Sequence, residues 1–211
     1  FELETAVIPD ERLRGKIRIA IHGVRMLCTA AIVMAFLGYF GEWLTLLPSE
    51  LLSGDACSRV TESWSVMTKL DDFMPLTAEN CGQFGADTRI VTGLDQVIAS
   101  PAGLLEGQRL ALVDVINSAA WILVVILLEI EVRVLTRWGG ASMPLSQVAT
   151  LAKAVLYATL VAAAIYWGFK GDFLDFWDAA LWLFAFVFIE LNVFEWQQEL
   201  RDQTSETLGI R

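Results

Sequence analysis

The sequence is poor in the residues on which metal centres and covalent catalysis depend. It contains one histidine, His22, and only three cysteines among 211 residues. A single histidine excludes bis-histidine haem ligation, and cysteines without accompanying histidines argue against a zinc site. The sequence also lacks a glycine-rich phosphate-binding loop and a nucleophile motif. We therefore predict a protein that is not an enzyme, with no metal centre and no cofactor.

Basic charge is also scarce. Lysine and arginine number 15 against 25 aspartates and glutamates, which gives a formal net charge of −10. A protein that binds nucleic acid needs a basic face to displace counterions from the phosphates. The sequence shows no such face, and it predicts no nucleic-acid partner.

Apolar residues, in contrast, are abundant. They make up 55% of the chain, charged residues only 19%, and the mean hydropathy is +0.54. A spanning helix needs about 20 mainly apolar residues. Four stretches approach this length, and they predict an all-α membrane protein, a four-helix transmembrane bundle with spans at residues 19–47, 110–135, 148–169 and 174–196.

The distribution of lysine and arginine predicts the orientation, because cytoplasmic segments near helix ends are enriched in both. Basic residues cluster before the first span and around the connection between the second and third spans. Both termini are therefore predicted in the cytoplasm. The predicted organisation is a cytoplasmic segment with the first helix (1–48), an extracytoplasmic cap loop (49–107), three further helices (108–196) and a cytoplasmic tail (197–211).

The loop at 49–107 is too long and too polar to be a simple turn between packed helices. It contains Cys57 and Cys81, on the side of the membrane where the environment is oxidising. We predict a disulfide between them, which would close the loop into a small cap; two unpaired thiols are the alternative.

The four spans carry ionisable groups toward their predicted cytoplasmic ends. Charge within a bilayer is costly, so these groups are expected to face one another or water. One hypothesis is an ionic lock that holds the helices together. The other is a vestibule or pore whose carboxylates bind or relay cations or protons. The residues concerned are His22, Arg25, Glu129, Glu131, Lys153 and Glu190.

Acidic residues also gather near the predicted outer ends of the spans. They would either concentrate cations by their summed field or form a solvated rim. The members of this outer acidic mouth are Glu42, Asp114, Asp172, Asp175 and Asp178.

The second span has a recognisable pattern: Leu112-Val113-Asp114, then Ala119-Ala120, then Glu131 seventeen residues after the aspartate. It resembles the Asp-to-Tyr-Glu helix of the YqhA-like family of small four-helix bacterial membrane proteins. Ile130 stands where that family has tyrosine, and the loop with the two cysteines is longer than the family's short connection. The resemblance implies a four-helix fold in a bacterial inner membrane. It does not imply a particular activity.

The predicted spans and their ionisable residues lead to two alternative functions. The first is a homo-oligomeric ion channel or transport-type protein that uses Glu129, Glu131 and Glu190, because four short helices enclose little interior volume and a pathway would form between subunits. The alternative is a non-catalytic accessory or assembly subunit of a larger membrane complex. The expected partners are the lipid bilayer, further copies of the chain or other membrane subunits, and cations or protons.

Overall fold

A computed structural model describes residues 16–138, 143–170 and 173–188. The chain divides into two compact units. We call Val33–Ala119 the cap unit, and Phe1–Ile32 together with Ala120–Arg211 the helical unit. Each unit is described by itself below.

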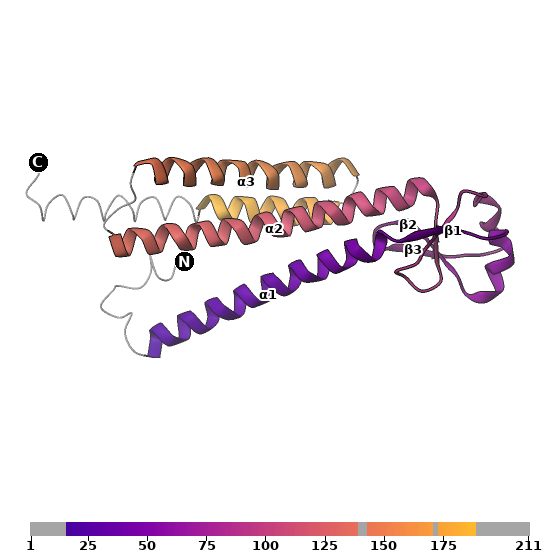
Figure 1. The fold of residues 1–211 in the computed structure, drawn as a ribbon, viewed down its shortest axis with the longest axis horizontal. Helices are drawn as coiled ribbons and strands as arrows, with labels where there is room; N and C mark the ends of the chain where they lie inside the picture. The colour runs from indigo at the N-terminus through magenta and orange to yellow at the C-terminus, as the bar shows by residue number, and fades with distance from the viewer. Residues whose placement is uncertain (1–15, 139–142, 171–172, 189–211) are drawn as a thin grey trace, which may run out of the picture. The chain divides into compact units, whose positions relative to one another are not determined.

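Long helices account for most of the described chain (Figure 1). They are α1 (Lys16–Leu46), α2 (Pro101–Trp138) and α3 (Met143–Lys170), and residues 173–188 are also helical. Proline at the first position of α2 suits a helix start, because the N–H that it lacks would have no partner inside the helix. In each helix the backbone polar groups bond within the helix itself, which is what a run of apolar residues requires in a membrane.

Three of these helices are long and apolar enough to cross a membrane: Ile19–Leu46, Pro101–Ile130 and Gln147–Lys170. This result confirms the apolar character of the first three predicted spans. The fourth predicted span, 174–196, is helical as far as residue 188, and its remainder lies outside the described residues.

The prediction of an all-α fold with a loop cap is wrong. The segment between α1 and α2 forms a mixed five-stranded sheet in the order β1-β4-β5-β2-β3. All its strand pairs are antiparallel except β2 with β5. The strands are β1 (Ser49–Leu51), β2 (Ser65–Lys69), β3 (Asp72–Pro75), β4 (Arg89–Val91) and β5 (Val97–Ala99), with two 3-10 helices, η2 (Ala56–Glu62) and η3 (Cys81–Gln83).

The sheet has two covered faces, because successive side chains of a strand point to opposite sides. On one face, Met67 and Ala99 pack with Leu46 of α1 and with Leu104 and Ala111 of α2. On the other face the packing partners come from the chain around η2 and η3, and this second cluster comprises Leu52, Ala56, Val66, Leu76, Cys81 and Ile98. The cap unit is therefore built in three layers: helix ends, sheet, and a layer that contains both 3-10 helices.

Close contacts join the sheet to the end of α1. The Gln108 side-chain nitrogen donates a hydrogen bond of 2.7 Å to the carbonyl oxygen of Leu46, one of the carbonyls that a helix end leaves unpaired. Gly93, just after β4, lies so close to the backbone of Thr45 that a Cβ atom would collide with it. These contacts make the last turn of α1 part of the cap core.

In the helical unit, α2 and α3 pack with the helix at 173–188. Val124 and Leu128 of α2 and Leu160 of α3 are buried together. Trp121 lies against Phe186 with ring centroids 4.5 Å apart. A Cβ atom at Gly168 would lie 3.3 Å from the ring of Phe176, so the small residue allows close approach of α3 to the following helix.

Candidate functional site

An ion pair links two helices within the described part of the helical unit. The Arg25 guanidinium of α1 donates a hydrogen bond to the Glu129 carboxylate of α2, with nitrogen and oxygen 3.3 Å apart. Both side chains are largely covered, at 24% and 22% exposed. One turn further along α1, the Thr29 hydroxyl donates to the carbonyl oxygen of Arg25, so the polar face of α1 continues there. The structure thus brings together two residues that the sequence places 104 positions apart.

The other members of the predicted polar layer fall into two groups. His22 of α1 is exposed and Lys153 of α3 is half-buried, and neither is without a partner. Glu131 lies on α2, but its side chain is outside the part that the structure describes. Glu190 lies outside the described residues altogether. The described site is therefore the pair Arg25–Glu129.

The residues of the predicted outer acidic mouth are divided between the two units. In the cap unit Glu42 and Asp114 are half-buried, and the Glu42 carboxyl group interacts with that of Asp71 in the turn between β2 and β3. In the helical unit Asp175 and Asp178 are exposed on the helix at 173–188. Asp172 lies outside the described residues.

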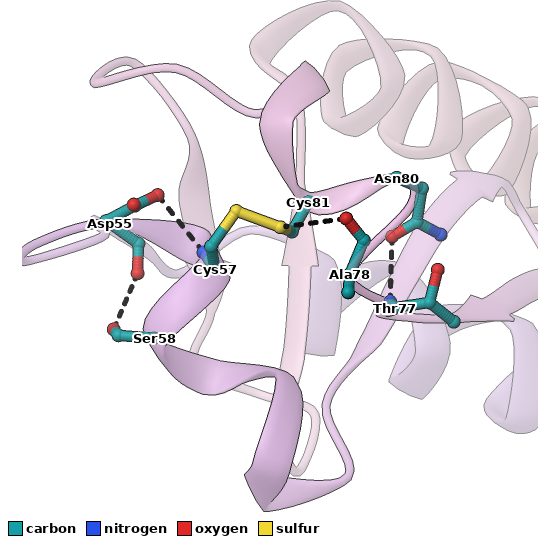
Figure 2. Close-up of a disulfide and its surroundings, with 7 residues drawn as sticks. All are labelled: Asp55, Cys57, Ser58, Thr77, Ala78, Asn80 and Cys81. Atoms are coloured by element: carbon teal, nitrogen blue, oxygen red, sulfur yellow. Dashed lines mark hydrogen bonds between the residues drawn. A yellow bond between two sulfur atoms is a disulfide. The ribbon is translucent and has the colours of Figure 1, made fainter.

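The predicted disulfide between Cys57 and Cys81 is confirmed. It joins η2 to η3, and Figure 2 shows it between the η2 start capped by Asp55 and the turn at Thr77–Asn80 that precedes η3. On one side the Cys57 amide donates a 3.1 Å hydrogen bond to the Asp55 carboxylate. On the other, the Thr77 amide donates a 2.8 Å bond to the side-chain oxygen of Asn80. The bond therefore closes the layer that covers the sheet face opposite to the helix ends.

Sequence reasoning missed a polar cluster at the end of η2. Arg59 and the indole N–H of Trp64 both donate to the same Glu62 oxygen, each at 3.0 Å. The Arg59 guanidinium carbon also lies 5.4 Å from the Trp64 ring centroid, within cation–π range. The hydrogen bonds from Arg59 and then Trp64 lower the pKa of Glu62. The short spacing of the three residues was the available signal.

Among the residues that the structure describes, no three His, Cys, Asp or Glu side chains are grouped as a metal site. No protein-family model, curated protein or solved structure matches the chain, so the resemblance of the second span to the YqhA-like family stays a prediction.

Proposed function

We propose that this chain is a non-catalytic subunit of a larger membrane assembly, with α1 and α2 joined by an ionic lock and a folded cap that faces the oxidising side. The observation that carries this proposal is the Arg25–Glu129 pair. A carboxylate that is already neutralised by a guanidinium from another helix has little remaining charge to offer a permeating cation. Its role is to hold two helices in register.

The cap supports the second half of this proposal. It is a layered α/β unit closed by a disulfide, and its core includes the ends of both α1 and α2. A persistent disulfide is typical of an extracellular or periplasmic environment. Together with the basic residues before α1, this favours a cytoplasmic N-terminus and a cap outside a bacterial inner membrane. Such a cap offers a stable surface to a partner subunit.

A homo-oligomeric channel is the second candidate, and one observation favours it. The side chains of Arg25 and Glu129 retain about a quarter of their exposure within helices that are apolar enough to cross a membrane. In a bilayer, that exposed part needs water or another polar group. A water-filled path between subunits would hydrate this exposed part and would make Glu129 part of a pore.

The substitution Glu129→Gln separates the two functions. It removes the negative charge and with it the Arg25–Glu129 ion pair. If the pair is an ionic lock, the substitution lowers the stability of the folded protein by about 1–2 kcal/mol. The measurement is thermal unfolding of the full chain in mild detergent, combined with cation and proton flux in proteoliposomes. Asp178→Asn is the matched control, because Asp178 is an exposed carboxylate of the same unit.

A double-mutant cycle assigns the effect to the pair itself. Arg25→Gln and Glu129→Gln together should cost less than the sum of the single substitutions, with a coupling of about 1 kcal/mol. The subunit proposal expects no flux from the unsubstituted protein. Robust cation or proton flux that Glu129→Gln abolishes at unchanged thermal stability contradicts it and supports the channel.

A further inference from the structure

The side chains of β3 lie on known faces of the sheet, because β3 pairs with β2 in a defined register. Phe73 is opposite Met67, and Met74 is opposite Val66. Directly paired residues of antiparallel strands point to the same side. Phe73 therefore lies on the face that packs against the ends of α1 and α2, where Met67 is buried, and Met74 lies on the disulfide face, where Val66 is buried.

Phe73 and Met74 differ from their buried partners because β3 is at the edge of the sheet. All four residues of β3 are exposed, with Phe73 at 45% and Met74 at 40%. The two side chains thus form a natural pair for comparison: they are adjacent and similarly exposed, but they lie on opposite faces of one strand.

The turn between β2 and β3 reaches back along α1. Asp71 in this turn lies close enough to Glu42 for the two carboxyl groups to interact. Glu42 lies four residues before the end of α1 at Leu46, which is about 6 Å along the helix axis. The same turn also approaches α2. A Cβ atom built on Gly107 of α2 would lie 3.8 Å from the backbone nitrogen of Leu70. The turn is therefore level with the final part of α1.

This level coincides with the end of the apolar part of the helix. The segment 26–41 of α1 contains no charged residue, and Glu42 is the first charge after it. When α1 crosses a bilayer, Glu42 marks the boundary between the hydrocarbon and the polar head groups. Trp43, at the same boundary, packs against the cluster that contains Met67. Amphipathic aromatic residues are enriched at this depth.

We propose that the β2–β3 hairpin is a membrane-interface anchor, in which Phe73 inserts among the lipids around the end of α1. An exposed phenylalanine two residues from a turn at the head-group boundary gains from contact with acyl chains. The acidic residues Asp71 and Asp72 keep the anchor shallow and give it no preference for anionic lipid.

A strand of a second copy fits this edge less well than lipid does. Pro75 has no N–H to donate, and the Asn80 side chain already donates a 3.0 Å hydrogen bond to the carbonyl oxygen of Pro75. Proline and an occupied carbonyl are features that protect a strand edge from pairing with another strand. The proposal rests on α1 crossing a bilayer and is independent of which subunits the chain assembles with, so it can fail while the proposed function holds.

The test compares two spin labels in the full-length protein in phosphatidylcholine nanodiscs. Phe73→Cys and Met74→Cys are each labelled in a Cys28→Ser background, with the Cys57–Cys81 disulfide retained and verified by mass. We expect the label at position 73 to collide more with oxygen, which concentrates in lipid, than with a water-soluble nickel complex. The label at position 74 should show the reverse preference, and a third label at Thr61 in η2, an exposed residue of the opposite layer, should behave like position 74.

A second measurement leaves the sequence intact. The unsubstituted protein is irradiated in nanodiscs that contain a phospholipid with a photoreactive group on its acyl chain, close to the head group. Lipid adducts are then mapped by mass spectrometry. Adducts on Phe73 and none on Thr61 support the anchor. The spin-label result overturns the anchor if positions 73 and 74 are equally exposed to water. It also overturns the anchor if position 73 is protected from both oxygen and nickel, as in a protein contact. The absence of lipid adducts from residues 70–75 overturns it as well.

Discussion

Removal of the Cys57–Cys81 disulfide tests how the cap is held together. The two cysteines are 24 residues apart. The chain-entropy relation for a loop of this length gives a stabilisation of about 3.5 kcal/mol, because the bond restricts the unfolded chain. Replacing both cysteines by alanine adds no polar group to the buried site of Cys81. We therefore expect the free energy of opening of the cap to fall by about 3.5 kcal/mol.

Amide hydrogen exchange in nanodiscs measures this change directly. Val66 and Ile98 are buried beneath the disulfide layer, and their amides should exchange only when the cap opens. A loss of 3.5 kcal/mol corresponds to about 300-fold faster exchange at both positions. Cys28→Ala, which removes an exposed free thiol, is the control and should leave them unchanged. An acceleration below about tenfold at both amides would refute the reasoning.

Two further predictions concern the same unit. Gly93→Ala places a methyl group against the Thr45 backbone and should destabilise the cap by about 1–3 kcal/mol in the same exchange assay. The control Gly82→Ala, whose methyl group enters open space, should destabilise the cap far less. Equal effects of the two substitutions contradict the close approach of Gly93 to Thr45. Since the Arg59–Glu62 pair lowers the pKa of Glu62, its contribution to stability is present above the ordinary carboxyl pKa and is lost as pH falls through the lowered one. Carboxyl NMR should show Arg59→Gln raising this midpoint, and an unchanged midpoint contradicts the pairing.

The long helices could be predicted from the sequence because length and hydropathy alone define them. The first predicted span, 19–47, differs by one residue at its far end from α1, which ends at Leu46. The second begins nine residues too late, since α2 starts at Pro101 and the prediction at 110. Those extra residues include Leu104, which packs on the sheet and not in a membrane bundle. Hydropathy does not distinguish these two kinds of burial.

The sheet could not be predicted in the same way. Its strands are three to five residues long, and they alternate with polar turns, so the averaged composition of the segment is that of a loop. Short β-branched runs such as Val97-Ile98 were the only local signal. The disulfide was predictable because two cysteines share one segment, which leaves a single pairing within it.

The sequence names Arg25 and Glu129 as candidate members of a polar site, but it does not predict that they pair with each other. Arg25 and Glu129 were both expected to seek partners, since charge inside a bilayer needs compensation. Helix periodicity places Arg25 on a face of α1 but does not say which helix lies opposite, and several pairings remained open. Asp71 was missed because its role depends on a hairpin that the sequence did not predict.

The mass and protein content of the native particle test the central claim most directly. The full chain is purified from its own membrane in mild detergent or nanodiscs, and the particle is weighed by native mass spectrometry with every subunit identified. A non-catalytic subunit predicts other membrane proteins in fixed stoichiometry with this chain. A ring that contains only copies of this chain, and that conducts cations or protons after reconstitution, would contradict the account.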